Sequence, residues 1–280
     1  MTDASDRAAA SGPRPEVLIC AGLDPSGGAG LIADVRVVSA LGCRPVGVVT
    51  ALTVQNTTAV LATEAMNPDL VREQLEFLLS DVEVKAVKIG MIGSSEVAKA
   101  IGNALALTHA AVVWDPIVHP SRGDVRFVDS LFGHAVQALS PHVTLLTPNA
   151  SELAFVAGAK ISSVVDAIVV GQRLAAQLGI AVLVTGGHLV GAQASNQSSD
   201  EADDESIDVL CHGDKVDLLR GRRTPGGEHV HGTGCALSSA IAAYLALGAE
   251  LVEACRAAKA YVAARIASPA RPGRGASAVV

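Results

Sequence analysis

The chain has 280 residues, of which 50% are hydrophobic, 18% are charged and only 2% are aromatic, and its formal net charge is -7. This length allows one large domain with a core of Ala, Val, Leu and Ile. The acidic balance and the lack of a dense Lys/Arg run argue against a nucleic-acid-binding protein. No apolar run reaches the roughly 20 residues that cross a bilayer, which argues against a membrane protein.

The N-terminal stretch and the cysteines both bear on location. Residues 1–15 are rich in Ala, Ser, Asp, Arg and Pro and lack the apolar stretch of a secretory signal, so we predict a disordered tail. The five cysteines are scattered, with no C-x-x-C pair and no disulfide-like spacing. We therefore predict a reducing, cytoplasmic location.

Aliphatic runs alternate with stretches of helical periodicity through the first two-thirds of the chain. The predicted strands are 17–23, 46–52, 86–91, 111–117, 143–146 and 181–184. The predicted helices between them are 29–41, 69–79, 95–107, 125–139 and 164–178. This alternation predicts βαβ units, and hence an α/β fold with a central, mostly parallel sheet flanked by helices.

The last third is predicted to differ in pattern. Residues 191–206 are polar and acidic, which indicates an insertion loop. An antiparallel pair at 207–210 and 215–219 follows, then two helices at 234–247 and 251–267, and a flexible C-terminal tail at 269–280. No linker divides the chain, so residues 16–268 are predicted to form a single domain.

The first stretch that could carry chemistry is AGLDPSGGAG at 21–30, between a predicted strand and a predicted helix. Ligands of open α/β sheets bind beyond the carboxyl ends of strands, and glycines allow close approach to the backbone. The alternative is an ordinary loop in which Asp24 or Ser26 caps the helix. Asp34, one turn into that helix, is also favoured there by the helix dipole alone.

Single polar residues follow or end three other predicted strands. Gln55 offers a donor and an acceptor that can match the edge of a pyrimidine ring, or it belongs to a plain polar loop. Lys88 either extends to the surface or reaches a ligand. Asp115, directly before Pro116, is a turn residue or a functional carboxylate at a strand end.

Two further strand ends carry residues suited to nucleotide and metal. Asn149 and Glu152 have the spacing of a helix capping box, and as oxygen donors they also suit Mg²⁺. Thr185, Gly186 and Gly187 allow a close backbone approach to nucleotide, or form a tight turn. Each pair of interpretations stays open on sequence grounds.

The stretch HGTGC at 231–235 opens a long Ala-rich predicted helix. Unpaired amides and the helix dipole make such a start an anion site. Cys235 in the first turn can have a lowered pKa and accept the proton of an attacking hydroxyl. The alternative is a small buried cysteine that packs the helix start.

The stretches AGLDPSGGAGLIAD, TALTVQNT, KIGMI, TPNASE, GGHL and HGTGC occur in this order over residues 17–264. Together they resemble the hydroxymethylpyrimidine/phosphomethylpyrimidine kinase family of thiamine biosynthesis, within the ribokinase-like superfamily. The resemblance implies a three-layer α/β/α fold, a homodimer, and use of ATP and Mg²⁺. It also implies that the hydroxymethyl group of a pyrimidine is the phosphate acceptor.

The resemblance implies a role for each matching residue. Cys235 is the implied catalytic base, and the implied anion hole consists of Gly232, Thr233 and Gly234. The implied pyrimidine pocket consists of Gly22, Ala29, Asp34, Gln55, Met91 and Ile117. The implied ATP and Mg²⁺ side consists of Asn149, Glu152, Lys88, Thr185 and Gly187, with Glu152 as the metal contact.

Three departures from the family pattern remove cations. Arg122 stands in a P-S-R-G stretch where the family has A-K-S-G, Thr185 replaces a lysine, and GEHV at 227–230 replaces T-K-N-T. Arg122, Lys88, Arg222 and Arg223 are the cations available to compensate. Loss of charge-assisted phosphate contacts predicts a slow or monofunctional member.

Three other functions remain open on sequence grounds. A pyridoxal kinase on the same scaffold acts on a similar heteroaromatic alcohol. The missing lysines also suit a weakly catalytic pyrimidine-binding protein. A nicotinamide oxidoreductase fits the α/β pattern, but the chain has no G-x-G-x-x-G fingerprint.

Overall fold

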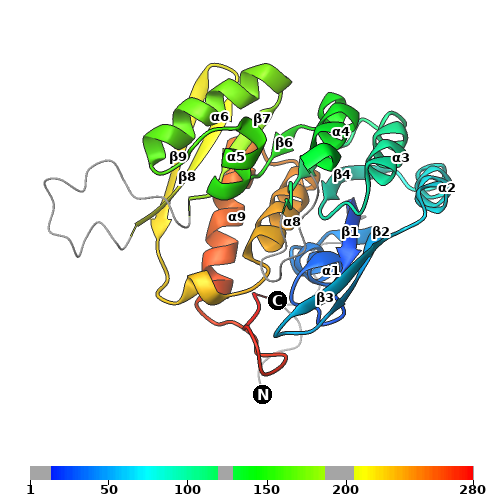
Figure 1. Cartoon of the computed structure of the whole chain (residues 1–280), viewed down its shortest axis with the longest axis horizontal. Coiled ribbons are helices and arrows are strands. Elements are labelled where there is room, and N and C mark those ends of the chain that lie inside the picture. The colour runs from blue at the N-terminus through cyan, green and yellow to red at the C-terminus, as the bar shows by residue number, and fades with distance from the viewer. Residues whose placement is uncertain (1–13, 119–128, 187–204, 280) are drawn as a thin grey trace, which may run out of the picture.

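The computed structural model describes residues 14–118, 129–186 and 205–279, which build one nine-stranded sheet with helices on both faces (Figure 1). The strands are β1 (Glu16–Leu23), β2 (Arg44–Gln55), β3 (Val60–Ala65), β4 (Val84–Ile89), β5 (Ala111–Trp114), β6 (Leu145–Leu146), β7 (Ala181–Val184), β8 (Glu205–His212) and β9 (Lys215–Arg222). The α-helices are α1 (Gly30–Ala40), α2 (Pro68–Leu79), α3 (Ser95–Leu105), α4 (Asp129–Leu139), α5 (Ala150–Ala157), α6 (Val164–Leu178), α8 (Thr233–Ala246) and α9 (Leu251–Ile266).

The sheet is mostly parallel, as predicted. Its order is β3-β2-β1-β4-β5-β6-β7-β8-β9, and the strands from β2 to β7 in this order pair in parallel. β3, β8 and β9 are antiparallel and occupy the two edges. Because consecutive parallel strands need crossovers, the carboxyl ends of the central strands meet at one edge of the sheet.

Two separate cores cover the two faces of the sheet, which gives the predicted three-layer α/β/α arrangement. One core holds the buried sides of α2, α3, α4, α5 and α6, and the other holds those of α1, α8 and α9 (Figure 1). The central strands are buried on both faces, which explains their continuous aliphatic sequence. Among the described residues, no helix is long and apolar enough to span a membrane.

Several boundaries differ from the prediction. β3 was not predicted, because its sequence VLATEA is mostly exposed and gives a weak strand pattern. Glu205 and Ser206, assigned from sequence to the insertion loop, belong to β8 and pair with Arg222 and Gly221. Residues 1–13, 191–204 and the predicted helix start at 125–128 lie outside the described residues.

The C-terminal segment also differs from the prediction of a flexible tail at 269–280. Ala270 and Ala278 exchange two backbone hydrogen bonds of 2.8 Å. The side chains of Ala278 and Val279 are buried. The described part of this segment is therefore held against the domain by backbone contacts, which leave no trace in a hydrophobic pattern.

Candidate active site

A cavity of about 670 Å³ opens at the carboxyl ends of β1, β2 and β4, beside the start of α8. Its lining comes from five separate parts of the chain, namely Gly22, Asp24, Ala29, Gly30, Thr53, Gln55, Asn56, Thr57, Ala59, Val60, Met91, Ile117, His231 and Cys235. Five of the six residues predicted to form the pyrimidine pocket are in this lining, together with Cys235. The position agrees with the general rule for ligand sites in parallel sheets.

The glycine loop before α1 is held by its own aspartate. The Asp24 carboxylate accepts hydrogen bonds from the backbone N–H of Ser26 at 2.8 Å and of Ala29 at 3.1 Å. Gly30 has a φ of +60°, and a Cβ there would lie 2.3 Å from the carbonyl oxygen of Gly22. Only glycine therefore fits at this position, and the loop presents backbone to the cavity.

The start of α8 is built in the same way. Gly232 is the N-cap residue with a φ of +81°, and a Cβ there would lie 2.1 Å from the Gly28 carbonyl oxygen. No side chain of the described residues caps this helix. The first amides of α8, at Thr233, Gly234 and Cys235, therefore keep the positive end of the helix dipole available for an anion.

The Cys235 thiol lies where the two glycine-rich segments meet. Its side chain is buried, and the nearby backbone N–H of Gly30 favours the thiolate form. Burial raises the pKa of the Cys235 thiol to about 12, although the nearby Lys88 charge partly opposes this. The sequence-based expectation of a lowered pKa was therefore wrong, because desolvation outweighs the favourable charges.

Lys88 and Asp34 form a fully buried ion pair beneath this site. The Lys88 Nζ lies 2.6 Å from Asp34 Oδ2, and the Ser239 hydroxyl donates to Asp34 Oδ1 at 2.8 Å. Neither charged side chain has any solvent exposure. Asp34 is therefore absent from the cavity lining, contrary to its predicted contact with the pyrimidine. Lys88, predicted on the ATP and Mg²⁺ side, is buried in this ion pair and is not part of the cavity lining.

Asp115 is a second buried carboxylate next to Cys235. It accepts a hydrogen bond from the Ser238 hydroxyl at 3.3 Å, and the neighbouring Cys235 thiol helps to lower its pKa. Burial raises the pKa of Asp115 to about 6, and the Lys88 charge limits the shift. Asp115 is thus a buried carboxylate beside the thiol, with a pKa raised toward neutrality.

Asn149 and Glu152 begin α5 at the end of β6. The Asn149 side chain accepts from the Glu152 backbone N–H at 2.9 Å, and Glu152 accepts from the Asn149 N–H at 2.8 Å. The capping interpretation is therefore confirmed. Burial and the charge of Asp115 raise the pKa of Glu152 to about 8. A carboxylate so placed fits a hard divalent cation, whose charge would offset both effects.

The sequence comparisons agree with this geometry. The profile of the phosphomethylpyrimidine kinase family matches residues 24–280. A hydroxymethylpyrimidine/phosphomethylpyrimidine kinase of Rhizobium meliloti (strain 1021) is 38% identical over 92% of this chain and 94% of its own length. A protein of the same name from Streptomyces coelicolor is 35% identical over 90% of this chain and 88% of its own length.

This chain belongs to the phosphomethylpyrimidine kinase family. It is therefore an enzyme that transfers a phosphoryl group. Among solved structures, a phosphomethylpyrimidine kinase from Clostridium difficile 630 is 33% identical, with a TM-score of 0.73 over 90% of this chain and 99% of that one. A Staphylococcus aureus pyridoxal kinase in complex with ADP is 27% identical, with a TM-score of 0.82 over 96% and 94% of the two chains. Both likenesses confirm the ribokinase-like α/β fold.

Some residues that were predicted to contact ATP belong to the described part of the chain, and others do not. Thr185 lies beside the start of α5, where it forms a bridge with Asn149 and its N–H donates to the Pro148 carbonyl oxygen at 2.9 Å. Gly187 and Arg122 lie outside the described residues. The structure thus brings Asn149, Glu152 and Thr185 together.

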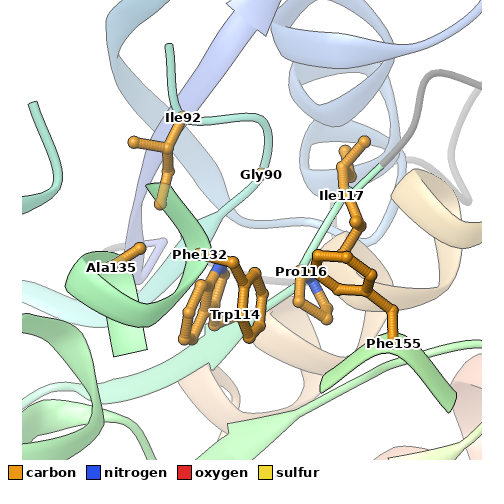
Figure 2. A pocket seen from close by; sticks show the side chains of 9 residues that line it. Gly90, Ile92, Trp114, Pro116, Ile117, Phe132, Ala135 and Phe155 are labelled. Atoms are coloured by element: carbon orange, nitrogen blue, oxygen red, sulfur yellow. The ribbon is translucent and has the colours of Figure 1, made fainter. Parts of the chain in front are cut away.

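A second, apolar cavity of about 370 Å³ lies next to the first cavity, which is called the kinase site below. Figure 2 shows its wall of Trp114, Phe132, Phe155 and Pro116, with Ile117 at one side. The Trp114 and Phe132 rings stack at 5.7 Å between centroids. Ile117 lines both cavities, so this residue lies between the candidate active site and the aromatic cavity.

Sequence reasoning missed several residues of the kinase site. Asp24 was considered only as a helix cap, yet it lines the cavity and its Oδ2 lies 3.6 Å from Nε2 of His231. Thr57 lies on the turn between β2 and β3, and a predicted β3 would have identified that turn. Asp115, in contrast, was considered from the sequence as a functional carboxylate at a strand end, and the structure places it next to Cys235.

Proposed function

We propose that this kinase transfers the γ-phosphate of ATP to 4-amino-5-hydroxymethyl-2-methylpyrimidine, to its monophosphate, or to both in succession, within thiamine biosynthesis. The observation that carries the proposal is that Gln55 and Cys235 line one cavity beside the uncapped start of α8. One cavity would thus combine Gln55, which can hydrogen-bond the edge of a ring, with Cys235 as a proton acceptor and the α8 start as an anion site.

The pyrimidine ring fits the described lining. Gln55 offers one donor and one acceptor to the ring edge, which an aminopyrimidine can match. Met91 and Ile117 supply apolar contact for the ring faces and the methyl group. A Cβ at Gly22 would lie 3.1 Å from the Met91 sulfur, so a side chain there would crowd this wall.

The proposed reaction moves one proton and one phosphoryl group. The substrate oxygen attacks the γ-phosphorus in line, its O–H bond breaks, and the bond from phosphorus to the β-phosphate oxygen breaks. The sulfur of Cys235 would receive the hydroxyl proton while its own proton passes to Asp115, the neighbouring carboxylate whose pKa the thiol influences. This order removes the need for a free thiolate, which the raised pKa of Cys235 disfavours.

The charge on the transferring group is met by backbone dipoles and by metal. The amides of Thr233, Gly234 and Cys235 would stabilise the phosphoryl oxygens, since positioning and electrostatics dominate phosphoryl transfer. Glu152 and Asn149 would hold Mg²⁺, which supplies charge neutralisation for the phosphates when it is bound. Solved pyridoxal kinase neighbours contain ADP or AMP-PCP, which supports ATP as the donor.

The second candidate function is a pyridoxal kinase. It is favoured by the Staphylococcus aureus pyridoxal kinase, whose complex with pyridoxal has a TM-score of 0.81 to this chain. The higher sequence identity to phosphomethylpyrimidine kinases, 33% for the Clostridium difficile structure against 26% for that complex, favours the pyrimidine.

Location and assembly are part of the same proposal. The five cysteines are free and buried, which supports a reducing, cytoplasmic environment. The β2–β3 hairpin exposes three large apolar side chains, Leu52, Val54 and Leu61, which supports a homodimer through this edge. Size measurement in solution tests the dimer.

The deciding experiment is an ATP-consumption assay with hydroxymethylpyrimidine, its monophosphate and pyridoxal in parallel. The pyrimidine or its monophosphate should give the highest kcat/KM. Gln55→Leu should raise KM for the pyrimidine more than KM for ATP, because only the ring loses a partner. A preference for pyridoxal, or no turnover of any of the three, would refute the proposal.

A further inference from the structure

Residues 270–279 form a small folded segment after α9, drawn in red in Figure 1, with bridges that join Ala278 to His231 and to Ala270. Ala270 and Ala278 exchange backbone hydrogen bonds, which close the segment into a narrow loop. Ala278 is 1% exposed and Val279 is 3% exposed. Such burial shows that this loop packs closely against the domain, although its sequence is mostly small residues.

One side of the 270–279 segment forms backbone hydrogen bonds with His231, just before α8. The His231 backbone N–H donates to the Ser277 carbonyl oxygen at 2.8 Å, and the Val279 N–H donates to the His231 carbonyl oxygen at 3.3 Å. A Cβ at Gly28 would lie 3.4 Å from the Ala278 side chain. The segment therefore touches both glycine-rich walls of the cavity, next to the anion site.

The other side of the segment holds the turn between β2 and β3. The Ala276 N–H donates to the Thr57 carbonyl oxygen at 3.0 Å, and the Gly275 N–H donates to the Thr57 hydroxyl at 3.1 Å. A Cβ at Gly275 would lie 1.8 Å from the Thr57 carbonyl oxygen. Only glycine permits this approach, so the contact depends on one backbone position.

Thr57 and His231 both line the cavity and lie far apart in the sequence. We propose that the 270–279 segment positions the β2–β3 turn over the substrate cavity, with Gly275 and Thr57 as positioning residues for the acceptor substrate. This inference rests on the proposed function for the identity of that substrate. Neither residue takes part in the chemical step.

The physical basis is preorganisation. A turn that is already held in place does not have to be ordered when the substrate binds, so its ordering cost does not weaken affinity. Each lost hydrogen bond of about 1 kcal/mol corresponds to roughly a fivefold loss of affinity. Release of both bonds to Thr57 should therefore raise the KM of the acceptor about 10-fold to 30-fold.

The test is Gly275→Ala, which puts a methyl group into the Thr57 carbonyl oxygen. The KM for hydroxymethylpyrimidine should rise at least 10-fold, while kcat and the KM for ATP stay within about twofold. The matched control is Gly133→Ala, on an exposed site of α4 where an added Cβ meets nothing within 4 Å. An unchanged acceptor KM, or a parallel loss in all three constants, would overturn the inference.

A second pair of variants covers the case in which Gly275→Ala fails to fold. Thr57→Ser keeps the hydroxyl that accepts from Gly275, whereas Thr57→Val removes it and keeps the shape. The valine variant should raise the acceptor KM about fivefold, and the serine variant should not. Equal effects of the two variants would contradict the proposed contact.

A readout without substrate separates this inference from the proposed function. Amide hydrogen exchange at residues 56–59 should become faster in Gly275→Ala and stay unchanged in Gly133→Ala. If the parent enzyme phosphorylates none of the three acceptors, the proposed function fails while the exchange result still decides the role of the segment. Unchanged exchange at 56–59 would overturn that role.

Discussion

The starts of α8 and α5 show two different uses of the same backbone geometry. At α5 the side chains of Asn149 and Glu152 satisfy the first amides in a capping box. At α8 the N-cap is Gly232, and no described side chain takes the amides. Both helices begin at the same edge of the sheet, so general stability of helices would favour a cap at each.

The difference favours the α8 start as the proposed anion site. A capped start has its donors satisfied, whereas an uncapped start beside a cavity keeps them for a ligand. At α5 the burial of Glu152 instead leaves a carboxylate with a raised pKa, which suits a cation. Under the proposed function, the α8 start would bind phosphate oxygens and the α5 start would hold the metal.

The largest expected effect is at the α8 start. Cys235→Ala should lower kcat by about 10²-fold to 10⁴-fold, the usual contribution of a positioned proton acceptor. The KM of the pyrimidine should change little, since the thiol is a small part of the lining. Steady-state kinetics measure both constants.

The matched control for that variant is Cys255→Ala. This cysteine is equally buried in α9, and burial likewise raises its pKa to about 12, but it does not line the cavity. It should keep kcat within about twofold, as expected of a buried residue remote from the chemical step. Equal activity of the two variants would remove Cys235 from the mechanism.

Gly232→Ala should have the next largest effect. The added Cβ would lie 2.1 Å from the Gly28 carbonyl oxygen at a φ of +81°, so the α8 start must move. A displaced donor group should lower kcat about 10²-fold to 10³-fold.

Gly158→Ala provides the control, at the end of α5. Its φ is +57° and an added Cβ meets nothing within 4 Å. Gly158→Ala should therefore introduce backbone strain of about 1–2 kcal/mol without a steric clash. Thermal unfolding measures the backbone strain in both variants, and kcat measures the displacement of the α8 start, which is expected only in Gly232→Ala. A large loss of kcat in Gly158→Ala would undermine the assignment of the anion site to α8.

A stability effect is expected at the α5 start. Burial and Asp115 raise the pKa of Glu152 to about 8, from a usual value of 4.5. The folded protein therefore binds this proton more tightly than the unfolded chain does. The resulting stability is complete below about pH 4.5 and is lost as the pH rises to about 8. The difference in Tm between the parent and Glu152→Gln should therefore change as the pH rises from 5 to 9, with the parent losing stability relative to the variant.

Asp166→Asn is the control for this pH dependence. Asp166 occupies the same capping-box position in α6, but its hydrogen bonds to Ser162 and Ser163 lower its pKa. Its contribution is lost only as the pH falls below its usual value of 3.8. The Tm difference for this variant should therefore be flat from pH 5 to pH 9. A flat difference for Glu152→Gln as well would contradict the raised pKa.

The smallest effect is expected for the cap itself. Asn149→Ala removes the acceptor for the Glu152 amide and should cost about 1 kcal/mol of stability. Denaturant unfolding measures this cost. Addition of Mg²⁺ and ATP to the parent should raise its Tm, and that gain should shrink in Asn149→Ala if the α5 start holds the metal. An equal gain in both proteins would place the metal elsewhere.

The sequence predicted those features that depend on local pattern. Buried parallel strands such as β1 and β7 are short aliphatic runs, and α6 has clear helical periodicity, so these elements were located well. Five of the six residues predicted for the pyrimidine pocket line one cavity because they belong to segments that follow strands, and a parallel sheet brings these strand ends to one edge.

The remaining features depend on contacts between distant residues. Asp34 and Lys88 are 54 positions apart, and no local pattern shows that each neutralises the other in the core. The raised pKa of Cys235 follows from burial, which the motif alone does not show. Thr57 and the 270–279 segment meet through backbone atoms, which carry no side-chain signal.

The Lys88–Asp34 pair also restricts how this protein can diverge. Loss of either partner leaves an uncompensated charge in a dry interior, which costs about 3–5 kcal/mol, a large part of the stability of a typical domain. Simultaneous replacement by two apolar residues of similar volume avoids this penalty. Descendants of this chain should therefore keep both residues or lose both, and a lineage with only one of them should be rare.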